Sequence, residues 1–166
     1  MDLTKLKQSI IRFEGLKLKP YKCPADKLSI GYGRNLEDNG ITINEAIFML
    51  ENDLLNIKLE LEDKLPVFNQ LDDVRQNVLI EMAYNMGVPK LLGFKNTIDY
   101  LEVAIFSLNN GDFGVAKSHF LFASEEMLNS KWHEQHKEYD LIDGKANNNG
   151  LLRSEYLSKL MKEGKY

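Results

Sequence analysis

The sequence predicts an α+β fold in which helices predominate and one small sheet lies near the N-terminus. Apolar residues recur at helical spacing before residue 14 and again over most of the chain after residue 42. The segment between them, residues 17–32, contains Pro20, Pro24 and Gly31, which exclude a helix. A chain of 166 residues is long enough for one core or for two small lobes that share a helix, so we expect a single domain over residues 1–166.

The first helix and the small sheet follow from local patterns. The helix has apolar residues three or four positions apart, namely Leu3, Leu6, Ile10 and Phe13. Gly15 is placed to end it directly after Glu14. Apolar Leu28, Ile30 and Tyr32 then alternate with small residues, which indicates a hairpin sheet with a turn around residues 24–27.

The remainder of the chain reads as helices. Thr42 and Glu45 form a capping box at the start of a helix over 42–65, about six turns long, which Pro66 ends. Further helices are expected over residues 71–86 and 97–108, from a cap at Asp112 to residue 128, around residue 132 and over 151–164. The polar, turn-rich stretch 137–150 is expected to be an exposed loop.

Composition and charge argue against several classes of protein, including nucleic-acid-binding and disulfide-stabilised proteins. The net charge of −4 provides no basic field for nucleic acid. The single cysteine, Cys23, cannot form an internal disulfide, which fits folding in a reducing cytoplasm. Residues 1–13 interleave charged and apolar side chains, so we expect neither a signal peptide nor a membrane span there.

Three side chains of the N-terminal segment could form a catalytic site. Glu14 lies at a helix C-terminus, where the dipole and partial desolvation favour the neutral carboxylic acid that a general acid requires. Cys23 and Ser29 could face it from the hairpin. Periodicity alone favours a plainer interpretation, in which Glu14 is solvated, Cys23 is a small buried apolar group and Ser29 is a turn hydroxyl.

Two sequence motifs resemble the T-even phage lysozyme family, glycoside hydrolase family twenty-four. The first runs from Phe13-Glu14-Gly15 to Tyr21, and the second is Leu28-Ser29-Ile30-Gly31-Tyr32-Gly33. The family pattern has glutamate, eight residues, aspartate or cysteine, five residues and threonine, and this chain has Glu14, Cys23 and Ser29 at those spacings. Similar stretches continue to Trp132 and Gln135 and resume weakly near residue 150.

The resemblance implies a lysozyme-like fold. A small lobe is expected over residues 14–41, a connecting helix over 42–65 and a helical lobe over 66–166. The helix of residues 1–13 is expected to pack with the C-terminal lobe.

The resemblance also implies that Glu14 is the general acid for the glycosidic bond between N-acetylmuramic acid and N-acetylglucosamine, with Cys23 and Ser29 completing a triad. Several members have aspartate and threonine at those two positions, and an ordinary thiol, with a pKa of roughly 8.5, is a poor base unless its surroundings stabilise thiolate. A nucleophilic Cys23 would give retention, and a water held by Cys23 and Ser29 would give inversion. Family analogy favours inversion.

Binding and supporting residues are implied more weakly. Tyr84, Asn85 and Thr97 would line the glycan cleft, although Tyr84 also has the spacing of a core residue. Arg153 resembles the basic residue that pairs with the catalytic glutamate. Arg34 stands where many members have a histidine, and we expect it to take over that residue's stabilising role.

No metal is expected. His119, His133 and His136 have no clear third-ligand motif beside them, and surface histidines are the simpler interpretation. We expect no cofactor.

The expected role is that of an endolysin for host cell lysis. Such a monomer would stay in the host cytoplasm until a holin opened the membrane, and would then act on periplasmic peptidoglycan. A lytic transglycosylase is one alternative, and a non-catalytic cell-wall-binding module on the same fold is another.

Overall fold

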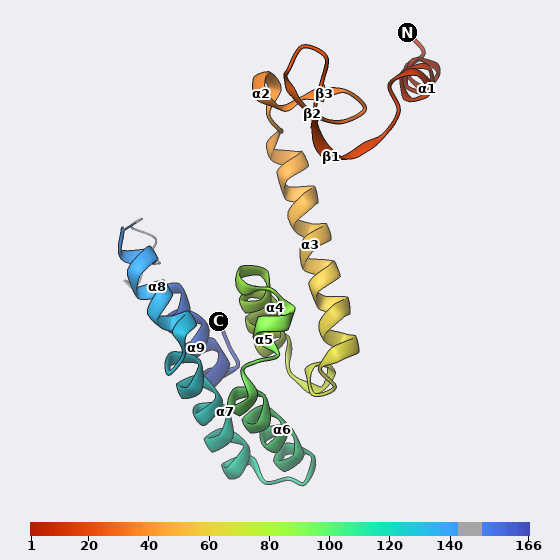
Figure 1. Cartoon of the computed structure of the whole chain (residues 1–166). Helices are drawn as coiled ribbons and strands as arrows, with labels where there is room; N and C mark the ends of the chain where they lie inside the picture. The colour runs from red at the N-terminus through yellow and green to blue at the C-terminus, as the bar shows by residue number, and fades with distance from the viewer. Residues whose placement is uncertain (143–150) are drawn as a thin grey trace. The chain divides into compact units, whose positions relative to one another are not determined.

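The computed structural model describes residues 1–142 and 151–166, with the backbone alone described over 138–142. The chain divides into two compact units, Met1–Glu51 and Asn52–Tyr166 (Figure 1). The division falls within one long helix. Each unit is described by itself.

The first unit opens with helix α1, Leu3–Glu14, as the apolar spacing predicted. The Asp2 carboxylate caps it by accepting hydrogen bonds from the backbone amides of Thr4 and Lys5, both at 3.1 Å. Gly15 ends the helix with a φ of +68°. No residue of α1 is buried. The expected packing of this helix on the C-terminal lobe stays a prediction.

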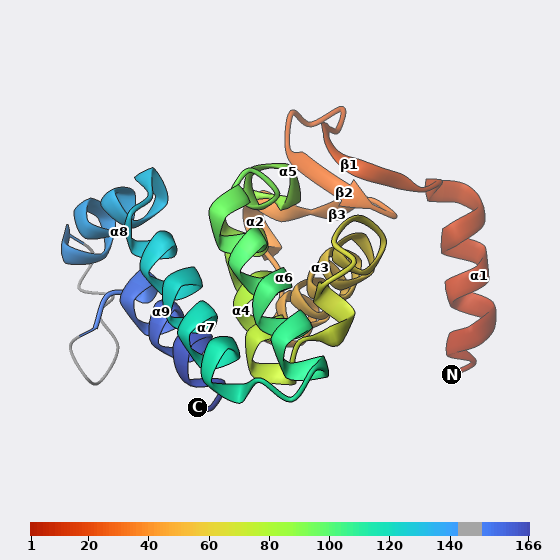
Figure 2. The same ribbon diagram turned by 90° about the horizontal axis from the view of Figure 1, so that it is seen from below.

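A three-stranded antiparallel sheet follows, in the order β1-β2-β3 (Figure 2). Strand β1 is Lys17–Lys22, β2 is Leu28–Gly31 and β3 is Arg34–Asn35. The predicted hairpin is confirmed. The third strand and helix α2, Leu36–Asn39, were not predicted, because two- and four-residue elements are too short to show a period.

Helix α3, Ile43–Lys64, confirms the predicted long helix. The capping box is formed as expected: the Thr42 amide donates to Glu45 Oε2 at 2.7 Å, and the Glu45 amide donates to Thr42 Oγ1 at 3.3 Å. Arg34 fastens the sheet to this helix start. Its Nε donates to the Gly40 carbonyl at 2.8 Å, and its guanidinium pairs with Glu45 at 2.5 Å.

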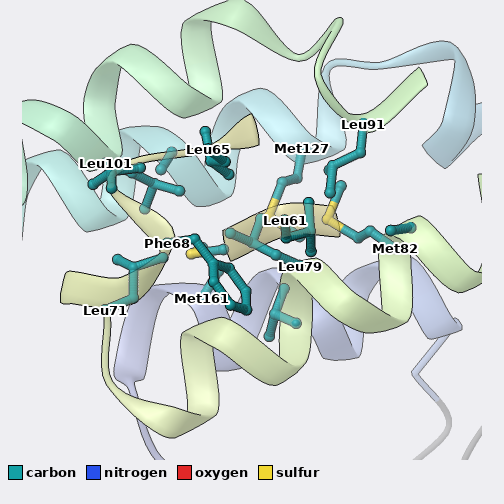
Figure 3. Close-up of a cluster of buried hydrophobic side chains, with 14 of the residues drawn as sticks. Leu61, Leu65, Phe68, Leu71, Leu79, Met82, Leu91, Leu101, Met127 and Met161 are labelled. Atoms are coloured by element: carbon teal, nitrogen blue, oxygen red, sulfur yellow. The ribbon is translucent and has the colours of Figure 1, made fainter. Parts of the chain in front are cut away.

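The described residues of the second unit form helices and the connections between them. After the end of α3 come η1 (Phe68–Gln70), α4 (Asp73–Met86), α5 (Val88–Leu91), α6 (Lys95–Asn109), α7 (Phe113–Leu128), α8 (Lys131–Ile142) and α9 (Arg153–Glu163). Helix α7 lies beside α6 and also beside α9 (Figures 1 and 2). These helices enclose a core of fully buried side chains that includes Phe68, Leu79, Met82, Leu101 and Met161 (Figure 3).

The predicted helices after Pro66 are confirmed, but η1 and α5 were not predicted and one predicted loop was wrong in part. The short helix α5 was missed because Pro89 suggested a break, although proline is well tolerated in a first helical turn. The loop predicted from Lys137 was wrong as far as Ile142, because α8 continues to that residue. The rest of that predicted loop, 143–150, lies outside the described residues. In the described ranges, no helix combines the length and the apolar character needed to cross a membrane.

Candidate active site

Glu14 lies where α1 ends and the sheet begins. Its side chain is exposed, and its carboxylate lies against the turn between β2 and β3. A Cβ atom placed on Gly33 would be only 2.9 Å from Glu14 Oε2. The pairing of Lys17 with Gly31 sets the start of β1 beside this same turn. Short-range strand pairing therefore fixes the glutamate next to the sheet.

Cys23 and Ser29 lie together at the other end of the hairpin. Cys23 directly follows β1, and its amide donates to the Lys27 carbonyl at 2.9 Å. Ser29 is paired with Tyr21 across the strands and is 3% exposed. Its hydroxyl donates to the same Lys27 carbonyl at 3.3 Å. The tight turn thus gathers the thiol and the hydroxyl around one backbone group.

The turn also stabilises a thiolate. Hydrogen bonding from the backbone of Lys27, and then of Ala25, lowers the pKa of Cys23 below its ordinary value, and the Ser29 hydroxyl adds a smaller lowering effect. A thiol with an ordinary pKa is mostly protonated near neutral pH and is therefore a poor base. The surrounding backbone moves that pKa in the direction that a base requires.

The three residues are not joined into one hydrogen-bonded group. Among the described residues, no hydrogen bond links Glu14 to Cys23 or Ser29. Since Glu14 is exposed on the first unit, that unit does not itself supply the desolvation expected for a general acid.

Glu37 is a residue of this lobe that the sequence did not single out. It accepts from the Leu28 amide at 3.0 Å and from Lys22 Nζ at 3.2 Å, and these contacts lower the pKa of Glu37, with the Leu28 amide the larger cause. Lys27 also pairs with it at 3.6 Å. Glu37 thereby holds α2 against the hairpin that carries Cys23. No motif signals it, because its partners are set by the fold.

A pocket in the second unit contains two of the three predicted glycan-binding residues. Its lining comes from α4, from the connection between α5 and α6, and from the region where α7 passes into α8, and it includes Asn85, Thr97 and Trp132. Asn85 is exposed, whereas Thr97 is 1% exposed and offers a ligand little surface. Tyr84 is 46% exposed but does not line this pocket.

Arg153 has a partner in its own unit. Its Nε donates to Glu81 Oε1 at 2.8 Å, joining the start of α9 to α4. The two residues are 72 positions apart, so no local pattern could have paired them. The expected pairing of Arg153 with Glu14 joins the two units and stays a prediction.

Two of the three histidines are not at the surface positions expected. His133 and His136 are 6% and 8% exposed, because α8 packs that face on α4 and α9. His133 Nδ1 lies 2.8 Å from Ser154 Oγ. His119 Nδ1 is 2.8 Å from the Val115 carbonyl. In the part of the chain that the structure describes, no three histidine, cysteine or acidic side chains are grouped to hold a metal ion.

Comparison with known proteins finds a similar relative and a matching family model. A curated relative named endolysin, from Acyrthosiphon pisum secondary endosymbiont phage 1, is 28% identical over 126 residues, which cover 74% of this chain and 79% of the relative. The family model described as phage lysozyme matches residues 11–121, from the last turn of α1 into α7. Because that match spans more than half of the chain, the chain belongs to the phage lysozyme family and is a glycoside hydrolase of the lysozyme type.

Proposed function

We propose that the chain is an endolysin that hydrolyses the β-1,4 bond between N-acetylmuramic acid and N-acetylglucosamine in bacterial peptidoglycan, and so lyses the host cell. The observation that carries the proposal is the position of Glu14 at the end of α1, with its carboxylate against the turn between β2 and β3 of the small sheet. Cys23 and Ser29 belong to the same sheet, at the opposite end of the β1–β2 hairpin. The family match begins at residue 11 and includes all three residues.

In this proposal Glu14 is the general acid. Its protonated carboxyl gives a proton to the glycosidic oxygen as the bond to the anomeric carbon breaks. Because the side chain is exposed on the first unit, the bound glycan itself would exclude water from it. Arg153 is proposed to support the charge of Glu14 after that transfer.

Cys23 and Ser29 are proposed to hold the attacking water. The lowered pKa of Cys23 supports a thiolate that accepts the water proton as oxygen bonds to the anomeric carbon. Ser29 is almost fully buried, which supports a fixed hydroxyl rather than a mobile one. Attack by such a water inverts the anomeric configuration, whereas direct attack by the Cys23 sulfur would retain it.

The pocket of the second unit is proposed to bind part of the glycan strand through Asn85. Thr97 is proposed to contribute from the same lining, and Tyr84 from its exposed position outside the pocket. An exposed amide beside an aromatic wall suits a sugar, because sugars combine hydrogen-bonding groups with apolar faces.

Clearing of permeabilised Gram-negative cells tests catalysis. Wild-type protein should clear the suspension, and Glu14→Gln, which keeps the shape but cannot donate the proton, should not. Glu102→Gln, at an exposed position of α6, is the matched control and should clear like the wild type. Equal clearing by Glu14→Gln would support the alternative of a non-catalytic wall-binding module.

Mass spectrometry of the digested peptidoglycan separates the two enzymatic reactions. Hydrolysis leaves reducing muramic acid ends. A lytic transglycosylase, which uses a substrate hydroxyl in place of water, leaves anhydro ends, so finding anhydro ends would overturn the hydrolytic proposal.

Access to the substrate is part of the proposal. We propose that the protein, as a monomer, stays in the host cytoplasm until a holin opens the membrane, and then reaches the periplasmic peptidoglycan. The net charge of −4 gives little attraction to an anionic wall, so binding should depend on contacts in the site rather than on long-range steering.

A further inference from the structure

The side chain of Asn85 is held from one side by two residues of α8. Trp132 Nε1 donates to Asn85 Oδ1 at 2.9 Å, and His136 Nε2 lies 3.4 Å from the same oxygen. The rings of Trp132 and His136 also pack edge to face, with centroids 4.9 Å apart. Both rings are buried, whereas Asn85 is exposed and lines the pocket of the second unit.

The contact with Trp132 identifies which atom of the Asn85 amide is the oxygen and which is the nitrogen. An indole N–H can only donate, so the Asn85 atom that it meets must be the carbonyl oxygen. The same oxygen requires that His136 carry a proton on Nε2. Within the described residues, the Asn85 NH₂ group has no hydrogen-bond partner, and it is the remaining polar end of an amide that lines the pocket.

We infer that Trp132 and His136 are positioning residues, which turn the Asn85 amide so that the pocket receives its NH₂ group and selects a hydrogen-bond acceptor on the substrate. The inference rests on the proposed function of this pocket in binding the glycan strand. It names the feature of the substrate that is recognised, an acceptor oxygen rather than a hydroxyl donor.

The acceptor has two possible sources in peptidoglycan. One is the carbonyl oxygen of an acetamido group on the sugar, and the other is a carboxylate of the peptide stem. Lys90, Lys95 and Lys131 line the same pocket and would add attraction for a carboxylate. Both sources need the same donor from Asn85.

Asn85→Asp is the main test, because it is nearly isosteric. Its carboxylate still accepts from Trp132 and His136, but the second oxygen replaces the donor with an acceptor. Against purified peptidoglycan we expect KM to rise about tenfold or more with kcat within about twofold, as for loss of a binding contact that is equal in the ground and transition states. The midpoint of thermal unfolding should not fall. An unchanged KM overturns the inference.

Two further variants separate donor loss from added charge. Asn85→Ala removes the donor without adding charge and should also raise KM. Asn69→Asp adds the same charge in the second unit at an exposed position outside the pocket, and should leave KM unchanged. If KM rises for Asn85→Asp and not for Asn85→Ala, charge alone explains the effect and the inference is wrong.

A double-mutant cycle tests whether Trp132 acts through Asn85. Trp132→Phe keeps an aromatic ring but loses the N–H donor, and should raise KM in the wild-type background. In the Asn85→Ala background the same substitution should change KM no further. A merely structural effect of Trp132 would be equal in both backgrounds, and that result overturns the inference. His136→Phe can replace Trp132→Phe in the same cycle, so the inference can still be tested if the tryptophan variant does not fold.

Two substrates distinguish the source of the acceptor. An N-acetylglucosamine oligomer has acetamido groups but no carboxylate, and a peptide-bearing glycan has both. If Asn85→Asp weakens binding of both, the acetamido oxygen is the acceptor, and if it weakens binding of the peptide-bearing glycan alone, the carboxylate is. An effect on neither overturns the inference. Failure of the proposed function would look different, since Glu14→Gln would then still clear cells.

Discussion

The carboxylate of Glu14 occupies the space that a side chain at Gly33 would need. A Cβ atom there would be 2.9 Å from Glu14 Oε2, and the backbone of Gly33 has a φ of +78°. Glycine at this position therefore serves two purposes, a left-handed turn and a close approach to the proposed acid. This relationship links the small-residue strand motif to the position of the glutamate.

Gly33→Ala should greatly lower the activity and moderately lower the stability of the protein. The methyl group would displace the Glu14 carboxylate, and a change of about 1 Å in a catalytic group can lower the rate about a hundredfold. The strain of the left-handed backbone should cost about 1–2 kcal/mol of unfolding free energy. The measurements are kcat/KM on peptidoglycan and denaturant unfolding.

Gly40→Ala is the matched control for backbone strain. Gly40 also has a positive φ, +56°, but a Cβ there would meet nothing within 4 Å. It should lose similar stability while keeping its kcat/KM within about twofold of the wild type. If the two variants lose activity equally, the contact with Glu14 is not the cause.

Alkylation by iodoacetamide should reveal the lowered pKa of Cys23. The thiolate is the reacting form, so a pKa below the ordinary value means that more thiolate is present at neutral pH in the folded chain than in the unfolded one. The alkylation rate of native protein should therefore rise with pH at a lower midpoint than that of the urea-denatured chain. Identical midpoints would show that the turn does not stabilise the thiolate.

Ser29→Ala gives a graded version of this measurement. The Ser29 hydroxyl is a smaller cause of the lowered pKa than the backbone of Lys27 and Ala25. Its removal should move the alkylation midpoint part of the way toward that of the denatured chain. A midpoint equal to that of the denatured chain would mean that the hydroxyl, and not the backbone, is the main cause.

Acidification should weaken the start of α3 through Glu45. The Thr42 amide is the largest cause of the lowered pKa of Glu45, with smaller contributions from the Thr42 hydroxyl and Arg34. A carboxyl whose folded pKa is depressed stabilises the fold fully above its unfolded value, 4.5, and loses that contribution as pH falls through the folded pKa. Wild-type protein should thus lose more stability below pH 4.5 than Glu45→Gln does. Chemical denaturation of both proteins at several pH values measures these free energies of unfolding. Equal losses of stability by the wild type and Glu45→Gln on acidification would contradict the prediction.

Much of the fold could be predicted because its signals are local. The capping box at Thr42, the cap at Asp112 and the stop at Gly15 each depend on residues within three positions. The contacts that could not be predicted join distant segments. Glu81 with Arg153 and Asn85 with Trp132 are examples, because nothing near either residue encodes its partner.

The candidate site divides in the same way. The motif spacing located Cys23 and Ser29, and the hairpin brings them together because both flank one tight turn. The effect of the Lys27 backbone on the pKa of Cys23 could not be predicted, since it depends on turn geometry rather than residue type. His133 and His136 were wrongly expected at the surface for a related reason. A polar residue on a short helix is usually exposed, but α8 packs against two other helices.

Arg75 should be a major source of stability in the second unit. It is 8% exposed, and its Nε donates to the Met161 carbonyl at 2.7 Å while its Nη2 donates to the Lys162 carbonyl at 3.1 Å. The guanidinium also pairs with Asp72 and lies 3.6 Å above the Phe120 ring. One side chain thus joins the start of α4 to α7 and to the end of α9.

Arg75→Met should cost about 3 kcal/mol of unfolding free energy, because it leaves two carbonyls at the end of α9 and the Oδ2 atom of Asp72 without the guanidinium donor. Arg75→Lys keeps the charge but cannot reach three partners at once, so its cost should be intermediate. Lys58→Met is the control, since it breaks only the half-exposed pair with Glu62 within α3 and should cost about 0.5 kcal/mol. Denaturant unfolding of the three variants measures the order. Equal costs for Arg75→Met and Lys58→Met would mean that burial and the carbonyl contacts add nothing to the ion pair.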